Sequence, residues 1–113
     1  MTISHPLPEP LIELIAQRFR LMGEPMRIKI LDRLRDGSAT VGVIASDLGA
    51  TQQNVSKHLG ALHQGGLISR AKEGNSVRYA IADDTVFELC ELVCGGLRSQ
   101  LAELDAILDG TQA

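Results

Sequence analysis

The chain has 113 residues, 44% of them hydrophobic, with two phenylalanines, one tyrosine and a formal net charge of −3 at pH 7. This length suits a single domain with an aliphatic core, which buries about two-thirds of the surface that the unfolded chain exposes. No apolar run approaches the roughly 18 residues of a membrane span, and no N-terminal export signal is present. With two thiols and no such signal, we expect a cytoplasmic protein that does not bind membranes.

The N-terminal part of the chain combines an irregular arm with two helices. Residues 1–10 hold three of the four prolines and predict the arm, and Pro10 fits the first turn of a helix that Gly23 ends. A second helix is expected from Glu24-Pro25 to Asp36-Gly37. Its basic side chains are Arg27, Lys29, Arg33 and Arg35, for which a solvated face is the default interpretation and contact with a DNA backbone the alternative.

The central stretch has the pattern of a helix-turn-helix. A short apolar-periodic segment begins at Val41 and stops at Gly49, a residue that accepts the left-handed backbone of a helix end. Thr51 can cap a second helix through its hydroxyl group. In that helix Val55, Leu59 and Leu62 recur at helical spacing. Two helices joined by a tight turn with a glycine indicate a helix-turn-helix.

The outer face of the second helix of this motif has the chemistry of a DNA-reading surface. With its apolar residues inward, Gln53 and Lys57 point outward, and no carboxylate occurs between residues 52 and 64. Glutamine can pair with adenine and lysine can donate to guanine in a major groove. We therefore predict DNA contacts from Thr51, Gln52, Gln53, Ser56 and Lys57, although many helices have a polar face simply because they face solvent.

A β-hairpin, or wing, is expected after this helix. A strand from Leu67 to Ala71, a turn over residues 73–76 and a half-buried strand with Val77, Tyr79 and Ile81 on one side fit the sequence. An exposed hairpin whose charges only confer solubility is the alternative to DNA contact. Phosphate contact is favoured beside such a helix, and the candidate residues of the wing are Arg70, Lys72, Asn75, Ser76 and Arg78.

The charges of the chain are distributed unevenly. Residues 17–35 hold six basic and two acidic side chains, residues 52–82 hold four basic and one acidic, and residues 83–113 hold one basic and seven acidic. Phosphate binding depends on the local charge and not on the net charge of the molecule. A net charge of −3 is therefore compatible with DNA binding by the helix-turn-helix half.

The last helix, capped by Asp83 or Asp84 and reaching Leu108, carries a heptad-like apolar stripe. Residues on the stripe are separated by three and four positions alternately, as in a helix-pairing seam. One small domain offers too little surface to cover it, so we predict a homodimer that also uses the first helix. The predicted interface residues are Leu11, Leu14, Ile15, Phe87, Cys90, Cys94, Leu97, Leu101, Leu104 and Leu108.

Cys90 and Cys94, the only cysteines, lie one helical turn apart on this stripe. Their Cβ atoms should be about 5–6 Å apart, which is longer than the roughly 3.5–4.5 Å of a disulfide. Two thiolates can instead converge on one thiophilic metal or metalloid ion, alone or with a second pair from another subunit. Oxidation between subunits is a further alternative, and so is plain packing, because free cysteine is usually a small buried hydrophobe.

Residues 19–81 resemble the ArsR family of bacterial winged helix-turn-helix repressors. The segment Phe19–Leu31 resembles the opening helix junction of that family, Gln53–Leu59 its recognition helix, and Glu73–Tyr79 its wing. The resemblance implies a homodimer that binds double-stranded operator DNA and releases it when a metal, metalloid or oxidant arrives. The chain departs from the family's metal signatures, because it has no Cys-x-Cys pair in residues 41–48 and no histidine in its last helix.

The sequence as a whole predicts a mainly α fold with a small β-hairpin: a winged helix-turn-helix that dimerises through its N- and C-terminal helices. The predicted organisation is an arm over residues 1–10, one domain over 11–109 and a tail over 110–113. The predicted function is effector-controlled transcriptional repression, and no cofactor is certain. A regulator without metal or thiol sensing, or a winged-helix protein-interaction module, is the alternative. An enzyme is not expected, since no phosphate-binding glycine loop or catalytic set is evident.

Overall fold

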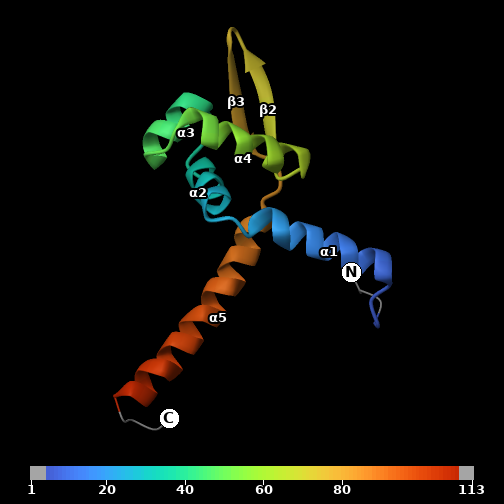
Figure 1. Ribbon diagram of the computed structural model, residues 1–113, viewed down its shortest axis with the longest axis vertical. Coiled ribbons are helices and arrows are strands. Elements are labelled where there is room, and N and C mark those ends of the chain that lie inside the picture. The colour runs from blue at the N-terminus through green and yellow to red at the C-terminus, as the bar shows by residue number, and fades with distance from the viewer. Residues whose placement is uncertain (1–4, 110–113) are drawn as a thin grey trace. The chain divides into compact units, whose positions relative to one another are not determined.

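The computed structural model describes residues 5–109 and contains the predicted winged helix-turn-helix (Figure 1). In chain order the elements are α1 (Glu9–Met22), α2 (Pro25–Leu34), β1 (Ala39–Thr40), α3 (Val41–Leu48), α4 (Gln52–Gln64), β2 (Ile68–Glu73), β3 (Ser76–Ile81) and α5 (Thr85–Leu108). The chain divides into two compact units, the first ending at Ala82 and the second beginning at Asp83. The boundary lies inside the single domain that we predicted over residues 11–109.

The N-terminal helix starts earlier than the sequence predicted. Helix α1 begins at Glu9, so the expected arm over residues 1–10 is two residues too long at its C-terminal end. Residues 1–4 of that arm, and the predicted tail over 110–113, lie outside the described residues. Pro8 is the N-cap of α1 and Pro10 lies in its first turn. A proline is tolerated there because the first N–H groups of a helix have no partner within the helix.

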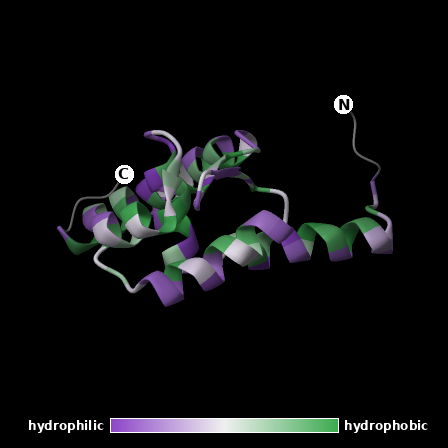
Figure 2. Ribbon diagram, turned by 90° about the horizontal axis from the view of Figure 1, so that it is seen from above, coloured by the Kyte–Doolittle hydropathy of each residue, from purple (hydrophilic) through white to green (hydrophobic). Residues whose placement is uncertain are grey.

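The core of the first unit lies among α2, α3 and α4. Their inward side chains are almost fully buried, among them Ile30, Ile44, Val55, Leu59 and Leu62, each with an exposed fraction of 0%. Along the helices hydrophobic and polar segments alternate, as amphipathic helices require (Figure 2). Arg33 links α2 to α3 on the outside of this core, with its Nε 2.7 Å from Oδ2 of Asp47.

The turn between α3 and α4 forms as the residue types predict. Gly49 ends α3 with a φ of 63°, in the left-handed region that glycine adopts without a Cβ clash. Two residues later the Thr51 hydroxyl oxygen accepts a hydrogen bond from the backbone N–H of Asn54, with an N–O distance of 3.1 Å. This bond caps α4 and fixes where the helix begins.

The hairpin belongs to a three-stranded antiparallel sheet with strand order β1-β3-β2. Strand β2 begins at Ile68, one residue after the predicted start, and continues past Ala71 to Glu73. The connection is a two-residue turn, Gly74-Asn75, in which Gly74 has a φ of 63°. The short strand β1, which pairs Ala39 with Tyr79, was not predicted. Two residues are too few to show a period in the sequence.

The predicted burial of the second hairpin strand is wrong over its first half. Tyr79 and Ile81 are half-buried, but Val77 is 37% exposed and so is on the surface. The hairpin projects beyond the helices of its unit (Figure 1). There Val77 pairs with Lys72 and both are exposed, so the alternation of residue types does not become an alternation of burial.

Helix α5 forms the second unit and ends at Leu108, as predicted. Asp84 is formally the N-cap, but the carboxylate of the preceding Asp83 accepts the bond from the Thr85 backbone N–H, at 3.0 Å. Most large apolar side chains of α5 are exposed, including Leu97 at 53%, Leu101 at 60% and Leu108 at 74%. Over residues 5–109, none of the helices is long and apolar enough to cross a membrane.

Candidate nucleic-acid interface

Helix α4 exposes the polar face that the sequence predicted. Gln52, Gln53, Ser56 and Lys57 are exposed, whereas Val55, Leu59 and Leu62 face the core. The exposed side chains carry amide, hydroxyl and ammonium groups, and no carboxylate lies on the helix. A DNA major groove offers acceptors and donors that match these groups. The first unit therefore has a helix whose free surface can hydrogen-bond to base edges without bringing a negative charge to the phosphates.

The N-terminal end of α4 is held in place by two small features. The Thr51 hydroxyl accepts a bond from the Asn54 N–H, which leaves its own proton free to be donated to an acceptor outside the protein. A Cβ built on Gly42 would lie 3.4 Å from Nε2 of Gln52, so the Gln52 side chain lies close against the start of α3. The sequence did not single out Gly42, because only the packing of α3 on α4 brings these two residues together.

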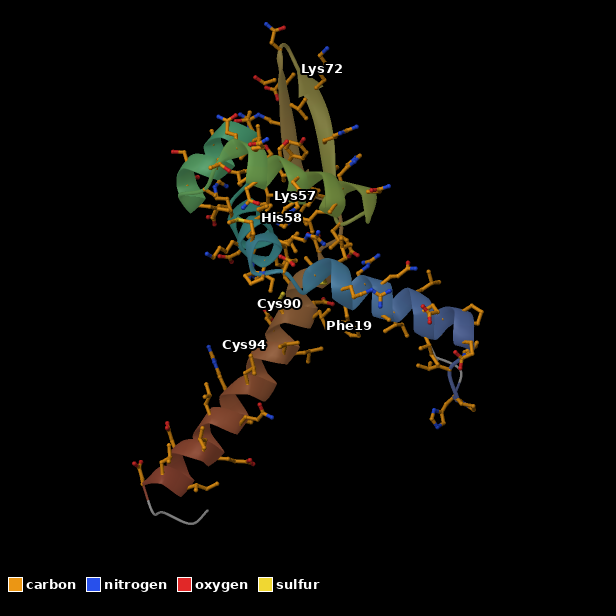
Figure 3. The ribbon with its side chains drawn as sticks, in the orientation of Figure 1. Phe19, Lys57, His58, Lys72, Cys90 and Cys94 are labelled. Carbon is orange, nitrogen blue, oxygen red and sulfur yellow. The ribbon has the colours of Figure 1, made fainter. Side chains whose placement is uncertain are left out.

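The basic residues of the wing lie on two different faces. Arg70 pairs with Tyr79 across the sheet and Lys72 pairs with Val77, while Arg78 pairs with Ala71 on β2 and with Thr40 on β1. Directly paired residues share a face, and successive residues alternate. Arg70 and Lys72 are therefore on the face that also holds Tyr79, and Arg78 is on the opposite face. Lys72 lies toward the tip of the wing (Figure 3).

Arg78 is already engaged within the protein. One terminal nitrogen donates to the Ser38 backbone carbonyl at 3.0 Å and to its hydroxyl at 3.3 Å. The Nε atom lies 3.2 Å from Oε2 of Glu73. Arg78 thus links the wing to the segment that precedes β1. Its predicted contact with phosphate stays a prediction, and Asn75 and Ser76 are exposed at the hairpin turn.

A hydrogen-bonded histidine–arginine pair joins the core-facing side of α4 to α2. His58 is 6% exposed, and its Nδ1 atom accepts a hydrogen bond from Nε of Arg27, on α2, at 3.1 Å. Burial lowers the pKa of His58 below its ordinary value, and the positive charges of Arg27 and Lys57 lower it further, while Glu24 acts in the opposite direction. His58 is therefore a packing and polar-contact residue on the core side of α4.

Cys90 and Cys94 are free thiols on successive turns of α5 (Figure 3). Cys90 is half-buried and Cys94 is exposed. Among residues 5–109, no group of three or more His, Cys, Asp or Glu side chains is arranged to hold a metal ion. A structural zinc site uses four ligands and a catalytic one at least three. The two thiols of one chain therefore fall short of a complete site by themselves.

The residues predicted for dimerisation are largely accessible. On α1, Leu14 is 61% exposed, while Leu11 and Ile15 are half-buried; on α5, Phe87 and Cys90 are half-buried and the predicted residues from Cys94 to Leu108 are exposed. Phe19, also on α1, is 56% exposed (Figure 3). Apolar surface on this scale is uncommon in a protein that stays a monomer.

Comparison with known proteins places this architecture in a family. The family model described as a helix-turn-helix domain matches residues 22–70. Rv0081 from Mycobacterium tuberculosis, an uncharacterized HTH-type transcriptional regulator, is 33% identical over 106 residues, which cover 93% of this chain and 93% of Rv0081. The homodimeric winged helix-turn-helix DNA-binding domain of Mb0332 from Mycobacterium bovis, a candidate ArsR-family regulator, is 30% identical, with a TM-score of 0.72 over 89% of this chain and 94% of that chain. The chain belongs to the ArsR family of winged helix-turn-helix transcriptional regulators.

A solved structure and a further relative are also similar to this chain. The crystal structure of Rv0081 superposes with a TM-score of 0.77, covering 88% of this chain and 100% of that chain. A protein of Streptomyces lividans named "Probable mercury resistance operon repressor" is 32% identical over 77 residues, which cover 68% of this chain and 62% of that protein. The predicted family and fold are therefore confirmed.

Proposed function

We propose that this ArsR-family regulator is a homodimeric, sequence-specific transcriptional repressor that inserts α4 into the major groove of operator DNA. The observation that carries the proposal is the exposed face of α4, where Gln53 and Lys57 stand on a surface without carboxylates. Glutamine and lysine at such positions read adenine and guanine edges. Thr51, Gln52 and Ser56 flank them and can donate to phosphates.

The wing supports the same proposal from beside the helix. Arg70 and Lys72 are exposed and share one face of the hairpin. Charged side chains on a projecting hairpin can reach the backbone on either side of the groove that α4 enters, and each neutralised phosphate adds to affinity. Asn75 and Ser76, at the turn, are placed to reach a minor groove. We assign Arg78 a weaker DNA role, because its guanidinium group already contacts Ser38 and Glu73.

Dimerisation supplies the two copies of α4 that a palindromic operator requires. The exposed apolar side chains of α1 and α5, such as Leu14, Leu101 and Leu104, are the surface that a second copy would bury. Mb0332, which has the same fold, is a homodimer. A two-fold dimer presents its recognition helices to half-sites about one helical turn apart.

The effector response is assigned to Cys90 and Cys94. Two thiolates on successive turns of α5 can bind one thiophilic ion such as trivalent arsenic, mercury, cadmium or zinc, and the dimer would bring together four. The name of the Streptomyces lividans relative refers to mercury resistance. Because one chain offers only two of the ligands that a zinc site needs, a second pair from the partner is required for a complete site. Zinc is a weaker candidate than an ion that the two thiolates of one chain can bind, because zinc needs ligands from both subunits.

DNA binding by α4 is tested by substituting its two most outward polar residues. We expect Gln53→Ala and Lys57→Ala each to weaken binding to a duplex selected from a random library, by about 1–3 kcal/mol, because each removes a base-edge contact. Gel mobility shift measures the effect. Thermal unfolding should be unchanged, since both side chains are exposed.

The matched control is Gln64→Ala, which truncates an exposed glutamine in the last turn of the same helix. This variant should bind like the wild type. If both Gln53→Ala and Lys57→Ala bind DNA normally, α4 is not the helix that contacts DNA. A protein-interaction module, the alternative function, would show no salt-dependent shift with any duplex. For a DNA-binding protein the logarithm of the binding constant falls linearly with the logarithm of the salt concentration, with a slope of about −0.9 for each phosphate contact.

The thiol response is tested with the double variant Cys90→Ser, Cys94→Ser. Serine keeps the size of the side chain but is not a ligand for soft ions, so we expect the variant to bind the selected duplex and to stay bound when arsenite, Cd²⁺, Hg²⁺ or peroxide is added. Wild-type protein should dissociate with at least one of these. If the wild type and the variant release DNA equally, the cysteines only pack.

A further inference from the structure

The guanidinium group of Arg27 connects three helices of the first unit. Its Nε atom donates to Nδ1 of His58, on α4, at 3.1 Å. A terminal nitrogen donates to the backbone carbonyl of Leu21, in the last turn of α1, also at 3.1 Å. Arg27 itself belongs to α2. One half-buried side chain thus holds the end of α1 and the middle of the recognition helix through two directed hydrogen bonds.

The bond to His58 requires an unprotonated nitrogen at Nδ1. An imidazole nitrogen accepts a hydrogen bond only through its lone pair, so the ring must be neutral with its proton on Nε2. Arginine stays protonated and can only donate. A second proton on His58 would therefore place two donors against each other and set an imidazolium beside a guanidinium in a site where the histidine is 6% exposed.

A second contact ties the same turn of α1 to the C-terminal end of α4. A Cβ added to Gly65, the residue that follows α4, would overlap the side chain of Leu21. Leu21 therefore packs directly against the bare backbone of Gly65 while its carbonyl oxygen accepts from Arg27. The recognition helix is thus held at its middle through Arg27 and His58, and at its end through Leu21 and Gly65. Of these two contacts, only the one through His58 can respond to pH.

We propose that Arg27 and His58 are a positioning pair for the recognition helix, and that a proton taken up by His58 releases this helix and lowers the affinity for specific DNA. The inference rests on the proposed function, since it names a condition under which the same surface stops reading DNA. His58 is buried on the core side of α4 and does not touch the DNA-facing surface, so its effect is on orientation and not on contact.

The charged groups around His58 favour the neutral ring. Arg27 approaches from α2 and Lys57 from α4 itself, and both positive charges oppose protonation, while Glu24, at the N-terminus of α2, attracts the proton. Protonation therefore occurs below the ordinary histidine pKa of about 6.5. Because the unfolded chain binds this proton at higher pH than the folded chain, the stability that the pair contributes is present above about pH 6.5 and is lost as the pH falls through the lowered pKa.

The test uses His58→Asn in the full chain. The Oδ1 atom of asparagine can take the place of Nδ1 as acceptor for Arg27, asparagine does not titrate, and its helix propensity is close to that of histidine. Affinity is measured between about pH 8 and about pH 5.5, for the duplex selected by wild-type protein and for a shuffled duplex of the same composition. We expect the wild type to lose about tenfold in affinity for the selected duplex relative to the shuffled one, and His58→Asn to lose none.

The matched control is His63→Asn, which removes a half-buried histidine from the last turn of the same helix. This variant should keep the pH dependence of the wild type. Arg27→Gln, which deletes the charge but can still donate a hydrogen bond, should shift the transition to higher pH. An identical pH dependence in wild type and His58→Asn would overturn the proposal.

A measurement on the protein alone, without DNA, tests the positioning role of His58 separately from the proposed DNA-binding function. Amide hydrogen exchange at Val55, Leu59 and Leu62 reports how firmly α4 is held. We expect exchange on α4 to rise as the pH is lowered, after correction for the intrinsic rate, in the wild type and not in His58→Asn. Failure to bind any duplex at about pH 8 would refute the proposed function alone, whereas equal exchange in both proteins would refute the positioning role of His58.

Discussion

At the scale of single residues, the structure assigns different tasks to side chains of the same type. Arg27 supports α4 from the core side, Arg33 links α2 to α3, and Arg78 links the wing to the segment before β1. Arg70 is exposed on the wing, and within residues 5–109 it has no such hydrogen bond or ion pair. A basic residue in the helix-turn-helix half is therefore not automatically a DNA contact, because the geometry of its hydrogen bonds decides whether its charge is available.

Salt dependence separates the two kinds of wing residue. We expect Arg70→Ala and Lys72→Ala each to reduce the slope of log Kd against log salt by about 0.9, because each removes one phosphate contact, with little change in stability. Arg78→Ala should mainly lower the free energy of unfolding, since it removes the bonds to Ser38 and Glu73. Mobility shift at several salt concentrations and urea denaturation measure the two effects.

Arg98→Ala, which removes an exposed positive charge from α5, is the control for a general effect of net charge. A slope for Arg78→Ala that falls as far as that of Arg70→Ala would show that Arg78 also meets a phosphate. Unchanged slopes for both Arg70→Ala and Lys72→Ala would exclude this face of the wing from the interface.

At the scale of elements, the helix-turn-helix and the β2–β3 hairpin are defined by local chemistry, and the third strand of the sheet is not. Gly49 and Thr51 mark the end of α3 and the start of α4 by a positive φ and a hydroxyl cap, and both act within a few residues of the chain. The sheet depends instead on pairing across distance, since β1 contacts β3 nearly forty positions later in the chain. The strand that the sequence missed is the one whose existence depends entirely on its partner.

At the scale of the whole molecule, the apolar surface of α5 has a consequence for assembly. We expect Leu101→Glu to convert a dimer into monomers, because a carboxylate in a helix-pairing seam is costly to bury without a partner. Sedimentation velocity measures the change. Specific DNA binding should fall with it, since a monomer meets only one half-site.

Ser99→Glu is the matched control, because at about 100° per residue position 99 lies on the side of α5 opposite to Leu101 and is exposed. This variant should remain a dimer. Wild-type protein that sediments as a monomer at micromolar concentration would contradict the proposed assembly, as would a Leu101→Glu variant that stays dimeric.

Charge is also organised at this scale. Residues 83–113 hold seven of the acidic side chains and one basic one, while the recognition helix has no acidic residue. The part proposed to meet phosphate, residues 52–82, holds four basic side chains and one acidic one, Glu73, which is paired with Arg78. The free thiols lie in the acidic unit as well.

The sequence by itself determined the helices, the turn between α3 and α4, the polar outer face of α4 and the family. Each of these depends on interactions between residues close in the chain: helical spacing of Val55, Leu59 and Leu62, a glycine that accepts a positive φ, a threonine that caps. Tertiary structure alone decided that Arg78 is bound to Ser38, that Gln52 lies against Gly42, that Val77 is exposed and that Arg27 meets His58. These features depend on groups up to forty positions apart, and the spacing of residue types along a chain carries no information about which distant groups meet in the fold.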